Sequence, residues 1–241
     1  MNRIASPVSV AEGYKRWAAS YDQDPNPLLA REERYLLPLL GSLPPQRILD
    51  LACGTGRWLE LLRRHTGTNG AGIDDSSAML RFAGEKCGSS HRVAQGNCER
   101  LPFRDAAFDL AICSFALGHL TDLKSTAAEL ERVLQPGANL FISDLHPEAQ
   151  TRGWRVGFRD EEGPLEIETV LRPAEDVIAS FCSRAFERMS EESLWLGDPE
   201  KHIFTHAGKS DLFAEACKLP AVIVFHFRRV NTRLSSAEPR S

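Results

Sequence analysis

An apolar run that ends in an acid and passes directly into a glycine loop is the feature that most restricts the fold of this chain. The run Ile48-Leu49-Asp50-Leu51 continues as Ala52-Cys53-Gly54-Thr55-Gly56, and a stretch with helical spacing starts at Arg57. This order predicts a strand, a tight turn and the N-terminus of a helix, where α/β proteins bind nucleotide-like ligands. Gly54 and Gly56 lack a Cβ, so a ligand can contact bare backbone. The alternative is a turn that needs glycine only for its geometry.

Two details of this loop separate the ligands it can hold. Asp50 stands where a nicotinamide-binding loop usually carries an apolar residue, and Leu59 stands where the dinucleotide pattern has its third glycine. The free N–H groups that open the helix favour an anionic group. An acid beside the loop suits a ligand with an ammonium group better than one with a pyrophosphate. S-adenosylmethionine (SAM) carries both an ammonium and a carboxylate.

Composition excludes several classes of protein. A formal net charge of −4 over 241 residues argues against a surface that coats nucleic acid. No apolar run approaches the ~18 residues of a membrane span, and the N-terminus lacks the apolar core of a signal peptide. The six cysteines form no C-x-x-C pair, so we expect no metal site, and a reducing cytoplasm is the simplest location.

Strands and helices alternate along the chain, which predicts a doubly wound, Rossmann-like α/β fold with a mostly parallel seven-stranded sheet and an antiparallel last strand. We expect strands at 47–51, 70–74, 91–95, 108–114, 139–144, 185–196 and 221–229, with a short helix at about 208–217. Ser76 or Ser77 caps the helix after the second strand, and Thr121 or Asp122 caps the helix after the fourth.

The remaining segments complete one expected domain, residues 1–234. Residues 1–41 are expected to form an N-terminal helical cap, and residues 152–172 a hairpin lid inserted after the fifth strand, with its turn at 160–163. Residues 235–241 are expected to be a disordered tail.

A second acid, Asp74, follows Asp50 by 24 residues and ends the second predicted strand. In nucleotide-binding α/β folds an acid there accepts hydrogen bonds from two ribose hydroxyls. Alternatively, Asp74 or Asp75 only caps the next helix. Because two acids and two serines stand in a row, one can cap while another binds.

With these two sites, residues 10–147 resemble the class I SAM-dependent methyltransferases, and most of all the small-molecule branch that includes ubiquinone-biosynthesis-type enzymes. The matching blocks are 48–56, 72–80, 96–109 and 131–137. The resemblance implies SAM as cofactor, with S-adenosylhomocysteine as product, and transfer of the methyl group by in-line displacement to a small-molecule acceptor.

The resemblance also implies cofactor contacts. Loop residues would line the methionine end of SAM, Asp74 would hold the ribose, and Asn97 would meet the adenine amino group, with the Cys98 backbone N–H near a ring nitrogen. The Ser114 carbonyl would face the ammonium, and Tyr21, from the N-terminal helix, would fold over the carboxylate. The cofactor-binding candidates are Tyr21, Asp50, Ala52, Gly54, Gly56, Asp74, Asp75, Met79, Asn97, Cys98 and Ser114.

The chain departs from the family pattern at three positions. Ala52 replaces the first glycine of the loop, and Asn97 replaces the usual aspartate, so its amide oxygen can accept a hydrogen bond but brings no charge. Gly118-His119 stands where the family often has two histidines. Tyr21 also belongs to an aromatic face, with Tyr14 and Trp17, that can simply pack the first helix.

Two histidines are candidates for a catalytic base. His146 follows the fifth predicted strand and His119 follows the fourth, so both fall at the carboxyl edge of the sheet, and histidine titrates near neutral pH. Asp144 is a third polar candidate. The structural alternatives are that His146 holds a loop before Pro147 and that His119 caps the next helix. A hydroxyl nucleophile needs a base more than a thiol or an activated carbon does.

The expected partner is a small-molecule acceptor, without nucleic acid or membrane insertion, in a monomer or homodimer. Two other functions stay open: a non-catalytic SAM-binding or regulatory protein, and a nucleotide-linked oxidoreductase, against which Asp50 and Leu59 count. The acceptor atom, O, N, S or C, also stays open.

Overall fold

The computed structural model describes residues 6–23, 25–43, 47–88 and 92–231. Its main sheet has seven strands in the order β4-β3-β2-β5-β6-β10-β9. Their bounds are β2 (Ile48–Leu51), β3 (Gly70–Asp74), β4 (Arg92–Gln95), β5 (Phe108–Ser114), β6 (Leu134–Leu145), β9 (Phe186–Trp195) and β10 (Pro220–Arg229). Neighbouring strands from β4 to β6 pair in parallel, whereas β10 is antiparallel to β6 and β9. The predicted α/β fold class, including the antiparallel last strand, is confirmed.

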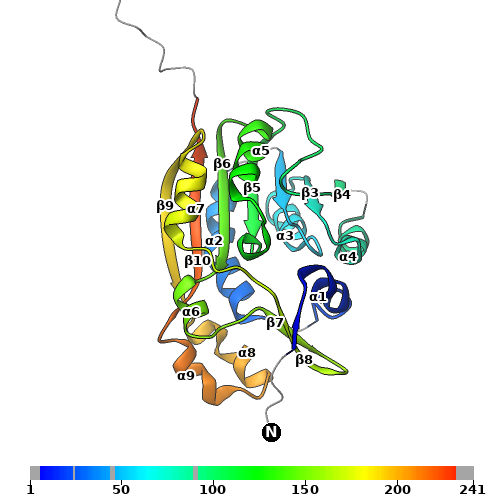
Figure 1. Cartoon of the computed structure of the whole chain (residues 1–241), viewed down its shortest axis with the longest axis vertical. Coiled ribbons are helices and arrows are strands. Elements are labelled where there is room, and N and C mark those ends of the chain that lie inside the picture. Colours follow the sequence, from blue (N-terminus) through cyan, green and yellow to red (C-terminus); the bar gives the residue numbers. More distant parts are fainter. Residues whose placement is uncertain (1–5, 24, 44–46, 89–91, 232–241) are drawn as a thin grey trace, which may run out of the picture.

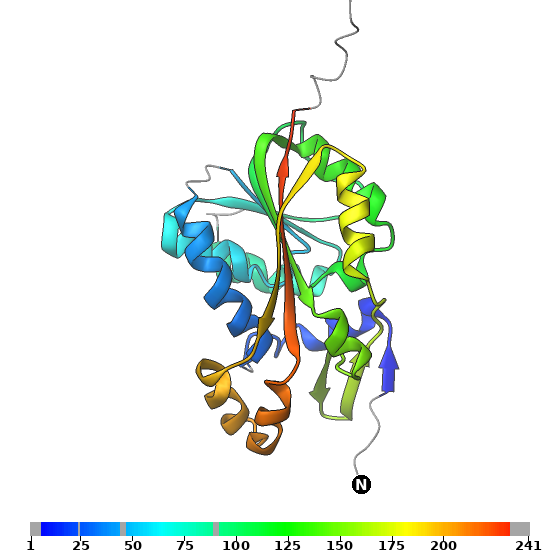
Figure 2. The same ribbon diagram turned by 90° about the vertical axis from the view of Figure 1, so that its left-hand side faces the viewer.

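Helices cover both faces of this sheet (Figures 1 and 2). On one face lie α2 (Pro27–Ser42) and α3 (Arg57–Thr66), and on the other α5 (Leu123–Val133) and α7 (Ala174–Cys182). Alternation along β2 sends Ile48 into the core beneath α2 and α3, and Leu49 into the core beneath α5 and α7. This burial on two sides explains why the strands read as continuous apolar runs in the sequence.

Polar side chains fix the starts of two helices for which the sequence left a choice. Ser76 precedes α4 (Ser77–Cys87), and its Oγ accepts a hydrogen bond from the Met79 backbone N–H at 3.4 Å. Asp122 precedes α5, and its Oδ1 accepts from the Lys124 backbone N–H at 2.9 Å. The caps are therefore Ser76 and Asp122, and they direct each helix away from the carboxyl edge of the sheet.

A second, three-stranded sheet lies at one end of the main sheet, next to α1 (Val10–Trp17) (Figure 1). It has the order β1-β8-β7, from β1 (Ser6–Val8), β7 (Gly157–Asp160) and β8 (Gly163–Ile167). β7 and β8 form an antiparallel pair around the expected turn, and β1, which the sequence pattern did not indicate, pairs with β8 in parallel. We call α1, β1, β7 and β8 the cap.

The cap is held together by contacts between α1 and the hairpin. Nε of Arg16 donates to Asp160 Oδ2 at 2.9 Å, and its Nη2 donates to Glu162 at 2.7 Å. The rings of Trp17 and Phe158 stack with centroids 5.0 Å apart. A Cβ on Gly13 would come within 2.7 Å of Ile167, so glycine is what lets α1 approach β8.

Several local expectations differ from the structure. α1 ends at Trp17, so Tyr21 lies in the turns that follow and not in the N-terminal helix, because Ser20 and Gln23 turn the backbone there. Residues 1–41 were expected to form one N-terminal helical cap, but α2, which lies in this range, packs on the main sheet. β6 starts at Leu134 rather than 139, and a short helix, α6 (Pro147–Thr151), separates β6 from the hairpin.

The segment 198–216 contains more helix than expected. The expected helix at about 208–217 begins as a 3-10 turn, η4 (Ser210–Leu212), and continues as α9 (Phe213–Ala216). Before it come η3 (Asp198–Glu200) and α8 (Lys201–His206). The expected tail, 235–241, and the first residue of the expected third strand, His91, lie outside the described residues.

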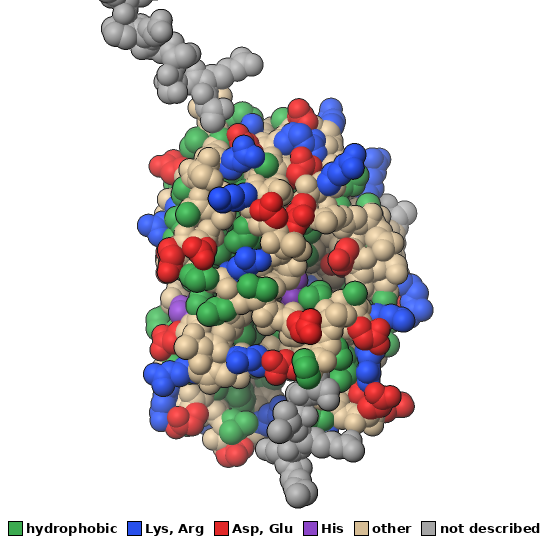
Figure 3. Space-filling view, viewed as in Figure 1, with side chains coloured by type: hydrophobic (Ala, Val, Ile, Leu, Met, Phe, Trp, Pro, Cys, Tyr) green, Lys and Arg blue, Asp and Glu red, His purple; other side chains and the backbone are tan. Residues whose placement is uncertain are grey.

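On the face of the described residues seen in Figure 3, acidic and basic side chains are interspersed over the whole surface. Among the described residues, no helix has the length and apolar character required to cross a bilayer.

Candidate functional site

The cavity of interest opens at the point where the strand order reverses, between β2 and β5, which is where ligands bind in open α/β sheets. Its walls come from α1, the loop after β2, the end of β3, the loop after β4 and the segment after β5. A smaller cavity adjoins it beneath the β2 loop. The predicted residues that line the main cavity are Tyr21, Ala52, Gly54, Asp74, Asp75, Met79, Asn97, Cys98, Ser114 and His119. Asp50 lines the adjoining cavity.

The loop after β2 has an unusual backbone. Ala52, Gly54 and Gly56 all have positive φ, of 54°, 53° and 76°. A Cβ on Gly54 would meet no atom within 4 Å, so it would project into the cavity that Gly54 lines. Gly56 lies outside the cavity as the N-cap of α3, and its N–H donates to the Cys53 carbonyl at 2.8 Å. The loop therefore presents bare backbone to a ligand at Gly54.

Asp74 holds this loop in place. Its Oδ2 accepts from the Gly54 backbone N–H at 2.8 Å, and its Oδ1 accepts from the Ser76 backbone N–H at 2.9 Å. Burial raises the pKa of this carboxyl, and the two backbone donors oppose the shift. Each carboxylate oxygen keeps a second lone pair. Positioning the loop and binding two ligand hydroxyls are therefore compatible roles.

Asp50 and Arg57 leave two buried polar atoms without hydrogen-bond partners among the described residues, Oδ2 of the acid and Nη1 of the base. Asp50 is only 2% exposed, and desolvation raises its pKa to about 8, although the charge of Arg57 lowers it. Nη1 of Arg57 lies 3.9 Å from a carboxylate oxygen of Glu33, too far for a hydrogen bond. Both side chains line the adjoining cavity. Within the described residues, an acceptor atom of a buried acid and an N–H group of a buried arginine are thus both left for a ligand, which fits a zwitterion such as the amino-acid end of SAM.

A hydrogen-bond network that the sequence did not indicate lies behind these groups. Glu32 of α2 is fully buried and pairs with Nη2 of Arg57. Its Oε1 accepts from Ser143 and also from Ser114, the latter at 2.7 Å, and Arg57 donates to Ser114 at 3.0 Å. A glutamate in an amphipathic helix carries no local sign of such a role. The only sequence signal was the position of Arg57 directly after the glycine loop.

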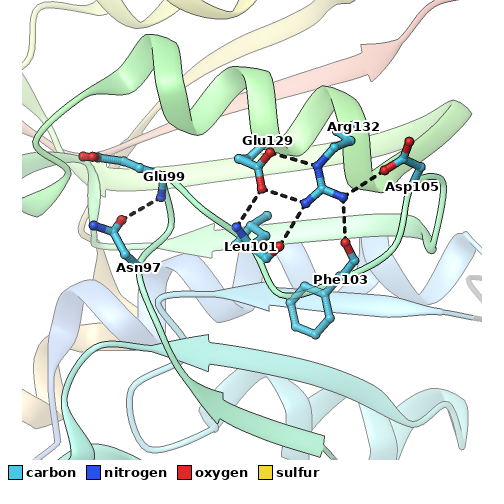
Figure 4. A network of polar contacts seen from close by, with 7 residues as sticks. All are labelled: Asn97, Glu99, Leu101, Phe103, Asp105, Glu129 and Arg132. Carbon is cyan, nitrogen blue, oxygen red and sulfur yellow. Dashed lines mark hydrogen bonds and ion pairs between the residues drawn. The ribbon is translucent and has the colours of Figure 1, made fainter.

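The loop that carries Asn97 and Cys98 is clamped from α5 (Figure 4). Arg132 donates to the carbonyls of Leu101, at 2.9 Å, and Phe103, at 2.6 Å, and Glu129 accepts from the Leu101 N–H at 2.7 Å. Hydrogen bonds join the two side chains, lowering the pKa of Glu129 and raising that of Arg132. The matching block 131–137 therefore contributes to the site at a distance, by fixing this loop.

Within the loop, Oδ1 of Asn97 accepts from the Glu99 backbone N–H at 2.7 Å (Figure 4). The amide thus shapes the turn while a lone pair and the NH2 group remain for a ligand. The Cys98 thiol is 8% exposed, and burial raises its pKa to about 12, so it is uncharged at neutral pH.

Two of the candidate polar groups lie away from both cavities. His146 caps α6: its Nδ1 accepts from the Glu148 N–H at 3.1 Å, which leaves Nε2 to donate to Ser193 at 3.1 Å. Both ring nitrogens therefore have structural partners, as in the alternative that His146 holds a loop. Asp144 is 7% exposed and accepts backbone N–H groups from Gly118 and Leu145, and burial raises its pKa to about 6.

His119, in contrast, lines the main cavity. It ends η2 (Leu117–His119), and its Nε2 is 3.0 Å from the hydroxyl of Tyr14, on α1. Burial lowers the pKa of His119 to about 4. Tyr21 lines the same cavity, and desolvation raises its pKa to about 12. Among the described residues, no three His, Cys, Asp or Glu side chains are grouped so as to hold a metal ion.

The sequence of this chain is similar to those of known proteins. The family model described as "Methyltransferase domain" matches residues 49–142. A demethylmenaquinone methyltransferase of Deinococcus radiodurans is 38% identical over 161 residues, which cover 65% of this chain and 64% of that protein. A 2-phytyl-1,4-naphtoquinone methyltransferase of Synechococcus elongatus is 36% identical over 110 residues, 43% of this chain and 47% of that protein. The chain thus spans less than two thirds of the length of these two relatives.

Among solved structures, an S-adenosylmethionine dependent methyltransferase from Mesorhizobium loti has a similar fold. The TM-score is 0.64 at 21% identity, over 84% of this chain and 100% of that chain.

Proposed function

We propose that this chain is a class I SAM-dependent methyltransferase, like the proteins that it matches, and that it transfers the methyl group of SAM to a small acceptor with a quinone-type ring. The observation that carries the proposal is a pair of buried atoms on Asp50 and Arg57 that have no hydrogen-bond partner in the part of the chain that the structure describes, beside bare backbone at Gly54. In this reading Asp50 receives the ammonium of SAM and Arg57 its carboxylate. Tyr21, which lines both cavities, covers this end.

The rest of the cofactor fits along the wall of the main cavity. Asp74 takes the ribose hydroxyls with the lone pairs that Gly54 and Ser76 leave free. Asn97 and the Cys98 backbone take the adenine edge, and Met79, 1% exposed, packs against the ring. The clamp from Arg132 and Glu129 supports this assignment, because it holds the adenine loop in one conformation before any ligand binds.

When bound, SAM supplies an electrophilic methyl group on a sulfonium. The residues of the chain have three tasks: to align the acceptor with that methyl group, to exclude water and to accept any proton that the acceptor loses. The cap contributes to the first two tasks, because α1 brings Val10 and Tyr14 into the wall of the cavity. We propose that the hairpin within 152–172 acts as part of this lid.

The acceptor side of the cavity supports an aromatic substrate. Its walls include Val10, Phe115 and Leu120, with Tyr14 and His119 as polar groups. Apolar walls with a few polar groups are typical of sites for ring compounds. The two relatives are named for quinone substrates, which supports the same class for this chain. The interspersed surface charges support a small acceptor rather than a phosphate backbone (Figure 3).

We also propose that the reaction takes place in the cytoplasm. The thiols of Cys98, Cys113, Cys182 and Cys217 form no disulfide bond, which supports a reducing compartment. A monomeric or homodimeric state stays a prediction, for which sedimentation at several protein concentrations is the measurement.

The test is release of S-adenosylhomocysteine from SAM with a panel of chemically reduced benzoquinones and naphthoquinones. We expect turnover with at least one of them, and no turnover with catechols, amines or thiols of similar size. SAM, and not NAD, is expected to raise the melting temperature. Stabilisation by NAD alone would support an oxidoreductase, and SAM binding without turnover of any acceptor would support a non-catalytic SAM-binding protein.

A further inference from the structure

Tyr14 and His119 come from distant parts of the chain and meet in the wall of the main cavity. Tyr14 lies on α1 of the cap and His119 ends η2, after β5. The phenol oxygen lies 3.0 Å from Nε2, and the rings pack edge to face with centroids 5.3 Å apart. Both side chains line the cavity. The sequence pattern placed Tyr14 only in an aromatic packing face.

The direction of this hydrogen bond follows from the surroundings of the imidazole. Burial lowers the pKa of His119 to about 4, so at neutral pH the ring carries one proton. Nδ1 is buried and has no hydrogen-bond partner of standard geometry in the described part of the chain. The backbone of Glu168 nevertheless acts on the ring as an acceptor does, since it favours the protonated form. Because Nε2 already faces the hydroxyl of Tyr14, we assign the proton to Nδ1, and in this tautomer Nε2 accepts from that hydroxyl.

The surroundings of Tyr14 keep its proton on the phenol. Burial raises the pKa of Tyr14 well above its usual value, and the nearby Tyr21, Asp144 and Asp74 raise it further. A phenol that donates its single proton to His119 has only lone pairs left for another partner. The partner that such an oxygen selects in the cavity is a hydrogen-bond donor, such as a hydroxyl group.

We propose that Tyr14 is a catalytic residue that binds a ring hydroxyl of the acceptor and passes its proton to His119. This inference rests on the proposed function and narrows the substrate class to hydroxyl-bearing, reduced quinone-type rings. The O–H bond of the acceptor breaks and its proton bonds to the Tyr14 oxygen. The proton of Tyr14 bonds to Nε2 of His119. The electron pair of the broken O–H bond stays on the acceptor and makes its oxygen, or the conjugated ring carbon, the nucleophile. If the carbon is methylated, its C–H bond then breaks, the proton goes to water, and the ring oxygen takes a proton back as the ring becomes aromatic again. His119 returns its proton to water after the product leaves.

The low proton affinity of His119 suits a relay that works in concert with the displacement. A ring hydroxyl becomes strongly acidic while its electron pair forms the new bond to carbon, so a weak base is sufficient at that moment. The same weak base leaves the free acceptor protonated, which prevents premature ionisation. Tyr14 therefore touches the acceptor, and His119 acts through Tyr14.

The first test does not depend on turnover. Long-range 1H–15N NMR spectra of the full chain report which nitrogen of His119 carries the proton, in the wild type, in Tyr14→Phe and in the control Tyr35→Phe, on α2 outside both cavities. We expect an unprotonated Nε2 in the wild type. We expect the pKa of His119 to rise in Tyr14→Phe, because the neutral ring loses a donor, and to stay unchanged in Tyr35→Phe. A protonated Nε2, or a pKa that falls in Tyr14→Phe, would overturn the proposal.

The second test measures turnover of a reduced naphthoquinone by the wild type, by Tyr14→Phe and by the control Tyr35→Phe. Tyr14→Phe is expected to lower kcat about 100-fold on the hydroxyl-bearing ring, the effect typical of a lost proton-transfer group. Its Kd for SAM is expected to stay within about twofold of the wild type, and the control Tyr35→Phe is expected to keep the wild-type kcat. Turnover of the hydroxyl-bearing ring within about threefold of the wild type would refute the role of Tyr14.

The outcomes separate this inference from the proposed function. If the wild type methylates only acceptors without a ring hydroxyl, methyl transfer stands and the role of Tyr14 falls. If the wild type methylates no acceptor, the proposed function falls and the catalytic role of Tyr14 falls with it, while the NMR measurement still decides the direction of the hydrogen bond.

Discussion

The affinity for SAM is expected to depend on pH, because the carboxyl of Asp50 has a raised pKa. In the free protein the pKa of Asp50 is about 8, so at pH 7 the carboxyl is ionised in about one molecule in ten. An ammonium placed against Oδ2 favours the ionised form. If only the ionised form binds tightly, the apparent Kd at pH 7 is about tenfold weaker than the intrinsic value, and it improves about tenfold per pH unit between pH 6 and 7.

The raised pKa of Asp50 also makes the stability of the free protein depend on pH. The folded pKa of Asp50 lies above its ordinary value of 3.8, so folding takes up a proton between those two pH values. This group therefore makes the free protein less stable as the pH rises from about 4 to 8. Bound SAM lowers the pKa again, so the rise in melting temperature that SAM produces is expected to be larger at pH 7 than at pH 6.

The assay is calorimetric titration with SAM from pH 5.5 to 7, where an α-ammonium group stays protonated, in phosphate and in Tris. The two buffers differ in ionisation enthalpy, so the difference in heat counts the protons released. We expect nearly one proton at pH 7. Asp50→Asn keeps the shape without the charge. Taking the ionised contact as worth about 100-fold, this variant binds about tenfold more weakly than the wild type at pH 7 and equally at pH 6, without proton release.

The matched control is Asp144→Asn. Asp144 is a second buried aspartate with a raised pKa, and it lines neither of the two cavities assigned to SAM. It is expected to keep the pH slope of the wild type. A wild-type Kd that is flat between pH 6 and 7, or an Asp50→Asn variant that keeps the slope, would refute the placement of the ammonium.

Three further predictions concern the loop and the edge of the sheet. Asp74→Ala loses the acceptors of two backbone N–H groups as well as the ribose contact, so we expect SAM affinity to fall about 100-fold with the fold retained; unchanged affinity by calorimetry would contradict this. Gly54 has a φ of 53°, so Gly54→Ala is expected to lose about 1 kcal/mol of stability and to bind SAM at least about tenfold more weakly. The control is Gly67→Ala, at a φ of 70° outside both cavities; in urea unfolding it is expected to lose stability, with its affinity for SAM unchanged. His146→Ala removes a helix cap, so we expect a loss of about 1 kcal/mol with kcat nearly unchanged; a large loss of kcat would restore a catalytic role.

Much of the fold could be predicted because its signals are local. The apolar runs of β2 and β5 are buried on both faces, and such runs indicate a parallel sheet without any knowledge of the partner strands. Caps such as Ser76 and Asp122 act within three residues. β1 could not be predicted, because three residues that include a proline carry no periodic signal. Its strand pairing also depends on β8, which lies far along the chain.

The candidate site, too, could be predicted from the sequence only in part. The resemblance to class I SAM-dependent methyltransferases is confirmed by the comparisons. The predicted positions of Ala52, Gly54 and Asp74 converge on one cavity because each lies at the carboxyl end of a parallel strand or directly after it, and topology brings those ends together. Their roles toward SAM stay predictions. His146 satisfied the same positional rule, yet its ring turns away to Glu148 and Ser193.

The sequence alone determined the parallel sheet, the glycine loop and the resemblance to a family, since these depend on periodicity, turn chemistry and short motifs within a few residues. Only the tertiary structure decided which side chains meet. Glu32 reaches Arg57 and Ser114 from a helix with no motif, and Tyr14 reaches His119 across 105 residues. The physical reason is that hydrogen bonds and ion pairs require atoms within about 3 Å of each other. Separation along the chain does not determine that distance until the helices, the cap and the sheet have packed.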